Sequence, residues 1–183
     1  MIGAVAVWSM SRREVVASAT AVGEATFPYI PGLLAFRELP VLLEAFGIVG
    51  AHGYAPLHID AVICDGHGIA HPRGFGIACH LGLLLGIPTV GCGKSRLVGE
   101  FVMPATQKGS SSLLLYKERE VGQVVCTRDG VAPVFVSPGH LIGMKAAVDL
   151  ILRCCVRYRL PEPIRTAHKL AGDALRSYRR VLE

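Results

Sequence analysis

Long hydrophobic runs are missing from this sequence, although hydrophobic residues make up 51% of its 183 residues. The longest apolar run, around Leu81–Val90, contains Pro88 and is bounded by His80 and Lys94. A transmembrane helix needs about 20 consecutive apolar residues, so we expect no membrane span. The first ten residues lack a basic leader and have the pattern of a strand, so we expect no signal peptide.

Paired cysteine motifs are absent as well. The six cysteines all lie in apolar segments without a CxxC pair: Cys64, Cys79, Cys92, Cys126, Cys154 and Cys155. Zinc sites and disulfide frameworks place cysteines at characteristic short spacings. We therefore predict reduced core cysteines in a cytoplasmic protein. Internal repeats and low-complexity tracts are also missing, which predicts a single domain over residues 1–183.

Net charge is missing from most of the chain. The formal net charge is +5, and the segment from Arg153 to Glu183 holds eight Lys or Arg against three acidic residues, so the rest is neutral. A basic C-terminal region suits contact with a polyanion, because Lys and Arg neutralise phosphates and release counterions. An ordinary solvated helical face rich in arginine is the alternative.

The segment FPYIPGLLAFRE, residues 27–38, places an aromatic residue between two prolines. Pro28 and Pro31 hold φ near −65° and restrict the residues before them, so we expect Tyr29 in a stiff loop. A ring held in this way can lie against a base stack. The alternative is that Tyr29 packs on the core.

Apolar residues recur at helical spacing between Gly32 and Phe46 and predict a helix. Glu38 lies among them, and we expect it to point away from a stripe containing Leu42 and Phe46 and so to face a site. The alternative is that Glu38 is a solvated helix residue.

Residues 60–97 have the pattern of a strand, a helix and a second strand. The expected elements are Ala61–Cys64, Phe75–Leu85 and Pro88–Cys92. Parallel strands joined by a helix end at the same edge of a sheet, so Asp65 and Lys94 should lie together where open α/β sheets bind ligands. Asp is rarely buried without a partner or metal, which favours a functional Asp65. For Lys94, a phosphate contact and an ion pair with Asp65 both remain open.

Glycines and histidines surround these two charges. Gly66, Gly68, Gly91 and Gly93 are the glycines, a residue type that lets backbone approach a ligand closely. His67 and His71 are four residues apart, but glycines and a proline interrupt any helical zinc pair. His71, next to Arg73, is instead a candidate for contact with a phosphate or a metal-bound water. A zinc hydrolase that uses these histidines and cysteines is a further alternative, which the spacing disfavours.

The remaining elements carry fewer signals. Strands are expected at residues 110–116, 121–126 and 132–136, with a hairpin turn at residues 128–130. Ser137 is expected to cap a turn, formed with residues 138–140, into a helix whose core stripe runs from Leu141 to Val156. A last helix should span Ile164–Leu182, on which Arg165 and His168 could face one phosphate.

Five motifs in order, PYIPGLLAFRE, DGHGIAHPR, GKSRL, VSPGH and PEPIRTAH, resemble the endonuclease V family. The resemblance extends from the first residues to about Leu175. It implies an α/β fold with an RNase H-like mixed sheet flanked by helices. The implied activity is DNA repair: Mg²⁺-dependent hydrolysis, with Mn²⁺ as a substitute, of the second phosphodiester bond 3′ to deoxyinosine and other deaminated bases.

The resemblance also assigns roles to individual residues. It implies that Tyr29 is a strand-separating wedge, that Glu38 and Asp65 hold the metal, and that Lys94 is the active-site lysine. His71 and His168 match histidines placed near the scissile phosphate. Five further residues are expected to contact DNA or to line the base pocket: Arg73, Arg165, and the backbone of Gly66, Gly68 and Gly93. The expected partner of this monomer is double-stranded or single-stranded DNA with deaminated bases, and RNA remains open.

One part of the family pattern is missing. The resemblance implies a further metal-binding Asp on a central strand, in a motif of the form GVDVSF, before the strand that begins at Ile2. No acidic residue precedes Glu14. We expect the chain to begin downstream of that strand, and loss of a central strand removes ladder hydrogen bonds and buried apolar area, so poor folding or rearrangement is expected. A catalytically inactive module that binds inosine or nucleic acid is the alternative to an active enzyme.

Overall fold

The computed structural model describes residues 1–30, 32–51 and 58–182, and it describes Ala51, Val181 and Leu182 by their backbone alone. The chain divides into two compact units. The first comprises Met1–His58 and Glu162–Glu183, and the second comprises Ile59–Pro161. The expectation of one domain over residues 1–183 stays a prediction. Among the described residues, no helix combines the length and the apolar character that a membrane span requires.

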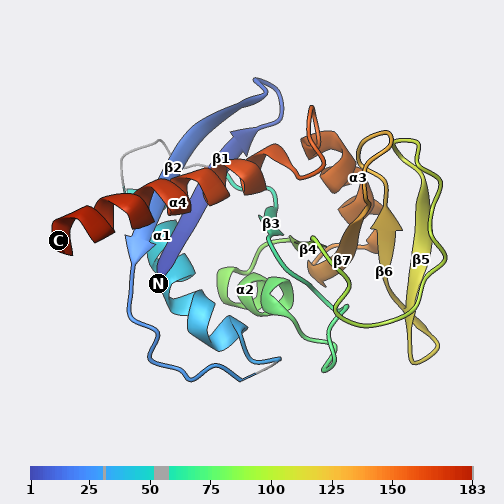
Figure 1. Ribbon diagram of the computed structural model, residues 1–183, viewed down its shortest axis with the longest axis horizontal. Helices are drawn as coiled ribbons and strands as arrows, with labels where there is room; N and C mark the ends of the chain where they lie inside the picture. The colour runs from blue at the N-terminus through green and yellow to red at the C-terminus, as the bar shows by residue number, and fades with distance from the viewer. Residues whose placement is uncertain (31, 52–57, 183) are drawn as a thin grey trace. The chain divides into compact units, whose positions relative to one another are not determined.

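The first unit is a two-stranded hairpin packed against two helices (Figure 1). Its elements are β1 (Ile2–Ser9), β2 (Glu14–Val22), α1 (Ala35–Ala51) and α4 (Glu162–Leu182). The strands are antiparallel, and α1 approaches β1 so closely that a Cβ on Gly3 would lie 2.6 Å from the carbonyl oxygen of Val41. The buried core of this unit is Val5, Ala17, Ala21, Val41, Ala45 and Val49.

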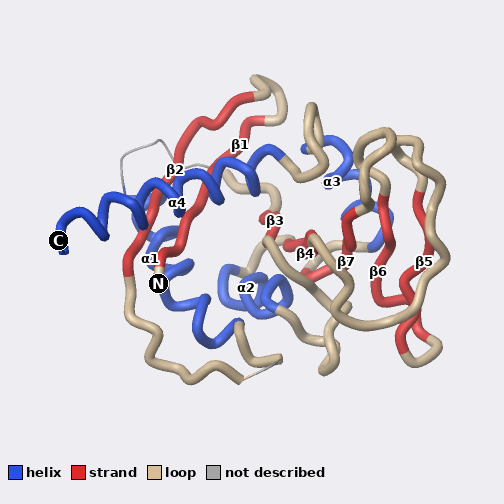
Figure 2. Tube along the Cα trace, in the orientation of Figure 1, coloured by secondary structure: helices blue, strands red, loops and turns tan. Residues whose placement is uncertain are grey.

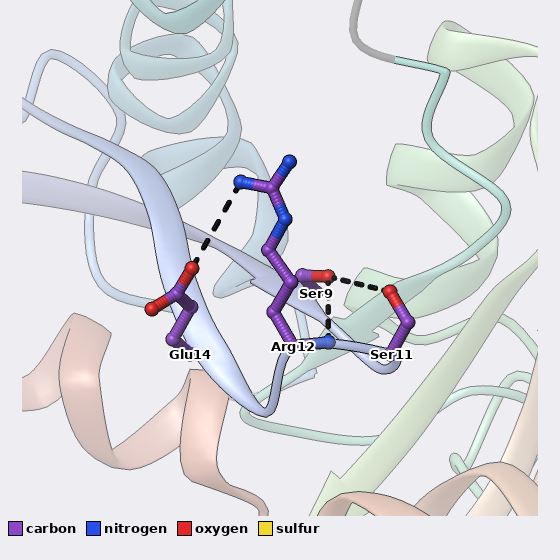
Figure 3. A network of polar contacts seen from close by, with 4 residues as sticks. All are labelled: Ser9, Ser11, Arg12 and Glu14. Carbon is purple, nitrogen blue, oxygen red and sulfur yellow. Dashed lines mark hydrogen bonds and ion pairs between the residues drawn. The ribbon is translucent and has the colours of Figure 1, made fainter.

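The turn between β1 and β2 is closed by local hydrogen bonds (Figure 3). The backbone N–H of Arg12 donates to Ser9 Oγ at 3.2 Å, and the Oγ atoms of Ser9 and Ser11 are also 3.2 Å apart. Arg13 adopts a φ of 57° and donates its N–H to the Ser9 carbonyl. The exposed Arg12–Glu14 pair, 3.9 Å apart, adds little stability because water screens it.

The second unit is a five-stranded mixed sheet with two helices (Figure 2). Its elements are β3 (Val62–Cys64), α2 (Ile77–Leu85), β4 (Thr89–Gly93), β5 (Ser111–Tyr116), β6 (Arg119–Val125), β7 (Val134–His140) and α3 (Met144–Cys154). The strand order is β3-β4-β7-β6-β5, in which β3 and β4 are parallel and the other neighbours are antiparallel. The predicted strand, helix and parallel strand around residues 60–97 are thus confirmed.

Helix α2 packs tightly on β4 and β7. Thr89 Oγ1 donates a hydrogen bond of 2.6 Å to the Ala78 carbonyl, and a Cβ on Gly82 would lie 2.4 Å from Thr89 Oγ1. The helix ends at Gly86, whose φ of 68° is the left-handed conformation that favours glycine. These contacts fix α2 against the strands that carry the site described below.

The segment from Ser137 to His140 was expected to turn into a helix, and this expectation is wrong. These residues continue β7, in which Ser137 is fully buried and pairs with Gly91 of β4. Pro138 lies where the ladder register shifts, a position at which a strand tolerates a residue without an N–H. Helix α3 begins only at Met144, so Leu141 is 67% exposed and lies outside the helix, as does Val156.

The first helix also differs from its prediction. Helix α1 spans Ala35–Ala51, and its buried face carries Val41, Ala45 and Val49. Glu38 does not point away from Leu42, because residues four apart lie on the same face of a helix. Glu38 is half-buried and lies in the first turn of the helix.

Candidate active site

Asp65 and Lys94 meet at the edge of the sheet where β3 and β4 end. Lys94 Nζ donates to Asp65 Oδ2 at 2.8 Å, and the two side chains are 45% and 37% exposed. Each charge directly follows a strand of the only parallel pair among the described strands. The ion pair, one of the two alternatives that the sequence left open for Lys94, is therefore present, and both side chains are partly exposed.

The loop after β3 lies directly on β4 and β7. A Cβ on Gly91 would lie 2.5 Å from Gly68 N, and one on Gly93 would lie 2.4 Å from His67 Cε1. The Gly68 N–H donates to Ser137 Oγ at 2.8 Å in a buried position. Packing thus explains these glycines without a ligand.

The proposed base pocket of Gly66, Gly68 and Gly93 stays a prediction. Of its three members, Gly68 already uses its backbone N–H in the bond to Ser137. Sequence reasoning missed the part that Ser137 plays in holding this loop, since a predicted helix cap gave no reason to look for a partner 69 residues away.

His67 and His71 differ in their surroundings. His67 Nδ1 is buried and has no hydrogen-bond partner among the described residues, and burial lowers the pKa of this imidazole. His71 is 7% exposed, and its Nδ1 accepts a hydrogen bond of 3.3 Å from the backbone N–H of Arg73. Burial, followed by the charge of Arg73, lowers the pKa of His71 below 6.5. Because Nδ1 is engaged as an acceptor, Nε2 is the ring nitrogen of His71 that is left to donate to a ligand.

Tyr29 and Glu38 belong to the first unit. Tyr29 is 68% exposed, as expected for a ring presented to a ligand, whereas Pro31, its second flanking proline, lies outside the described residues. Nearby, the rings of Phe27 and Phe36 stack with centroids 5.4 Å apart and tie the loop to α1. The acidic residue in the first turn of α1 is Glu38.

The predicted phosphate-facing residues Arg165 and His168 lie near the start of α4, also in the first unit. Arg165 Nη1 donates to Glu162 Oε2 at 2.9 Å, so its charge is partly neutralised by a neighbour on the same helix. His168, one turn further along, is exposed. Among the residues that the structure describes, no three His, Cys, Asp or Glu side chains gather around one candidate metal position.

Arg159 is a residue near the site that sequence reasoning did not single out. Its guanidinium donates to the carbonyl oxygens of Lys94 at 2.6 Å, Pro133 at 2.7 Å and Ala132 at 2.7 Å. The sequence placed Arg159 only within the basic C-terminal region. No spacing rule links residues 94 and 159, so the sequence held no signal for this contact.

Comparisons with known proteins agree on one family. A family model for endonuclease V matches residues 1–169. An endonuclease V of Nostoc punctiforme is 48% identical over 169 residues, which cover 92% of this chain and 74% of that protein. One from Geotalea uraniireducens is 50% identical over 161 residues, covering 88% of this chain and 66% of the relative. The chain thus spans about two thirds to three quarters of these relatives.

Solved structures show the same similarity. The crystal structure of an endonuclease V from Streptomyces avermitilis matches with a TM-score of 0.89 and 43% identity, covering 97% of this chain and 75% of that one. An endonuclease V from Ciona intestinalis, in complex with a 24mer DNA containing an inosine followed by a ribo-adenosine, matches with a TM-score of 0.84 and 26% identity, covering 97% and 80%. The expected RNase H-like mixed sheet flanked by helices is confirmed.

Proposed function

Because the chain belongs to the endonuclease V family of nucleases, we propose that it recognises deaminated bases in DNA and hydrolyses the second phosphodiester bond 3′ to deoxyinosine. The observation that carries this proposal is the Asp65–Lys94 pair at the open ends of β3 and β4. A carboxylate and an ammonium 2.8 Å apart offer a cation ligand and a phosphate contact side by side. The DNA-bound relative with inosine supports the substrate.

The donor chemistry fits a Mg²⁺ ion. Asp65 presents a partly exposed carboxylate, and Mg²⁺ is commonly held by one or two carboxylates together with waters and substrate phosphates. Asp65 and Glu38 are the proposed ligands, on the strength of the family motifs that they match. When bound, Mg²⁺ supplies Lewis-acid stabilisation of the charge on the scissile phosphate, and Mn²⁺ supplies the same chemistry.

Lys94 and His71 are proposed to act on the phosphate itself. The ammonium of Lys94 offsets negative charge that builds on the phosphate oxygens in the transition state. His71 donates from Nε2, since Nδ1 is engaged by the Arg73 N–H. This single contact is proposed to orient the phosphate. Arg73, which is exposed, is proposed to contact a neighbouring phosphate.

Base recognition is proposed to involve a wedge and a backbone pocket. Tyr29 is exposed enough to fill the gap left by an extruded base, and unstacking a mismatched base costs little. The backbones of Gly66, Gly68 and Gly93 are the proposed pocket. Arg165 and His168 are proposed to hold a phosphate at the start of α4.

The decisive experiment measures cleavage and binding separately. A labelled duplex with a single deoxyinosine, and the same duplex with deoxyguanosine, are incubated with the 183-residue chain in Mg²⁺ or in EDTA. We expect a single nick at the second bond 3′ to inosine that needs Mg²⁺. Asp65→Asn should abolish the nick, whereas Asp149→Asn, which removes an exposed carboxylate on α3, should leave it unchanged.

The outcome also distinguishes an enzyme from a binding module. Selective binding to the inosine duplex without a nick, under conditions in which a full-length relative cuts, would show that this chain recognises inosine but does not hydrolyse DNA. A nick that persists in Asp65→Asn would refute the role proposed for that carboxylate. Parallel substrates with inosine in RNA test the substrate class that the sequence left open.

A further inference from the structure

Three backbone carbonyls lie just beyond the end of the ladder between β4 and β7. The ladder between these strands ends at the pair Gly93 and Phe135, and the carbonyls of Lys94, Ala132 and Pro133 lie just beyond it. All three accept hydrogen bonds from Arg159 at 2.6 to 2.7 Å. A guanidinium carries five donors in a rigid plane, so one side chain can serve several carbonyls together.

Arg159 is itself held in place. Its backbone carbonyl accepts a hydrogen bond of 2.6 Å from Thr127 Oγ1, and Cys155 Sγ lies 3.4 Å from the same oxygen. Lys108 Nζ also donates to the Cys155 carbonyl at 2.7 Å. The segment after α3 is thus attached to the sheet at several points, and it presents a fixed guanidinium to the end of β4.

We infer that Arg159 is a positioning residue for Lys94. It acts on Lys94 through its hydrogen bond to the Lys94 carbonyl. The bond to this carbonyl holds the peptide plane after Lys94, and the β4–β7 ladder holds Gly93 before it, so together they limit the direction in which the Cα–Cβ bond of Lys94 leaves the chain. A four-carbon lysine side chain has many rotamers, and a fixed origin limits where its ammonium can go. Arg159 thereby keeps Lys94 Nζ beside Asp65, and this inference rests on the proposed function of that pair.

A double-mutant cycle tests the inference. Single-turnover cleavage of the inosine duplex in Mg²⁺ is measured for the parent chain, Arg159→Gln, Lys94→Gln and the double variant, at a temperature at which circular dichroism shows each to be folded. We expect Arg159→Gln to slow cleavage on the order of 10-fold, since small displacements of a reacting group are costly. In the Lys94→Gln background the same change should cost less than about 2-fold, since two residues that act as a unit are not additive.

Two further variants separate geometry from charge. Arg159→Lys keeps the charge, but one ammonium cannot span three carbonyls, so its rate should fall as in Arg159→Gln. Arg119→Gln removes an exposed arginine of β6 and should leave the rate unchanged. Full activity in Arg159→Lys, or an equal loss from Arg159→Gln in both backgrounds, would overturn the positioning role.

A readout without catalysis keeps the inference distinct from the proposed function. If the parent chain does not cleave, the proposed hydrolysis fails, and backbone amide exchange decides the role of Arg159. Arg159→Gln should then speed exchange at Ser95 and Arg96 on the order of 10-fold more than at the amides of β5 and β6, because local opening follows the loss of local bonds. Uniform acceleration across the unit would show a general loss of stability and contradict the inference.

Discussion

At the scale of single residues, the site depends on polar atoms that are buried and bonded. Ser137 is fully buried, and its Oγ accepts a hydrogen bond from the backbone N–H of Gly68. Loss of this acceptor leaves a buried donor without a partner, which costs about 1 to 3 kcal/mol. The Asp65 loop is therefore stabilised by a residue that takes no part in the proposed chemistry.

We predict that Ser137→Ala lowers the free energy of unfolding by about 1 to 3 kcal/mol in urea denaturation. Ser112 provides a matched control, since its Oγ is buried without a hydrogen-bond partner among the described residues. Ser112→Ala should change the free energy of unfolding by less than about 0.5 kcal/mol, because no bond is lost. Equal effects in the two variants would contradict the importance of the Gly68–Ser137 bond.

A second prediction at this scale concerns pH. The folded-state pKa of His71 is lowered from 6.5, first by burial and then by Arg73. The unfolded state therefore binds more protons, so the contribution of His71 to stability is present above pH 6.5 and is lost as pH falls through the lowered folded pKa. Protonation of Nδ1 also breaks its bond with the Arg73 N–H.

Titration by NMR should show the imidazole of His71 with a pKa below 6.5, and urea denaturation should show less stability at pH 5 than at pH 7.5. His71→Asn should reduce this pH dependence, because it removes the titrating group. A folded-state pKa at or above 6.5 would refute the prediction, as would an unchanged pH dependence in the variant.

At the scale of secondary structure elements, backbone contact decides how closely β3, β4 and the loop between β3 and α2 approach. A Cβ on Gly91 would lie 2.5 Å from Gly68 N and 2.6 Å from the carbonyl carbon of His67. Both neighbours are backbone atoms and cannot move aside as a flexible side chain would. The Asp65 loop therefore reaches its position only because β4 carries glycine at this point.

Gly91→Ala is predicted to lower the free energy of unfolding by about 1 to 3 kcal/mol, as overpacking of a rigid site does. The control is Gly47→Ala in α1, where no described atom outside the adjoining helix backbone lies within 4 Å of the added Cβ. This control should raise stability by about 0.5 to 1 kcal/mol, the usual gain of alanine over glycine in a helix. Thermal and urea denaturation of both variants check the sign of each change. A tolerated Gly91→Ala would contradict the close packing of the loop.

At the scale of the whole molecule, the net positive charge is concentrated in the C-terminal region. Some of its arginines are already engaged: Arg159 with three carbonyls, Arg165 with Glu162 and Arg176 with Asp173. The alternatives of a polyanion contact and a solvated helical face therefore apply mainly to the remaining basic residues. Arg179 and Arg180, in the last turn of α4, are exposed.

We predict that Arg179→Gln with Arg180→Gln weakens binding to the inosine duplex and to a plain duplex alike. Each lost phosphate contact should reduce the slope of log K against log salt by about 0.9. Binding constants measured by fluorescence anisotropy at salt concentrations from about 50 to 300 mM give this slope. Arg12→Gln in the exposed β1–β2 turn is the control, and an unchanged slope in the double variant would favour the solvated face.

The sequence by itself determined the strand, helix and parallel strand around Asp65 and Lys94, and with them the proximity of these two charges. Strand and helix periodicities can be read from neighbouring residues alone. A right-handed crossover between parallel strands then places the ends of both strands on one edge of the sheet. For Tyr29 the sequence left an exposed ring and a ring packed on the core both open, and the structure shows it 68% exposed. The order of five motifs determined the family.

Only the tertiary structure decided what holds that site together. Ser137 lies 69 residues from Gly68, and Arg159 lies 65 residues from Lys94. These contacts exist because the antiparallel pairing of β4 with β7 brings distant segments side by side. The local sequence pattern does not indicate such pairing. Ser137 was therefore predicted as a helix cap, and Arg159 was placed only within the basic C-terminal region. The physical reason is that a hydrogen bond depends on distance in space, whereas periodicity reports only neighbours along the chain.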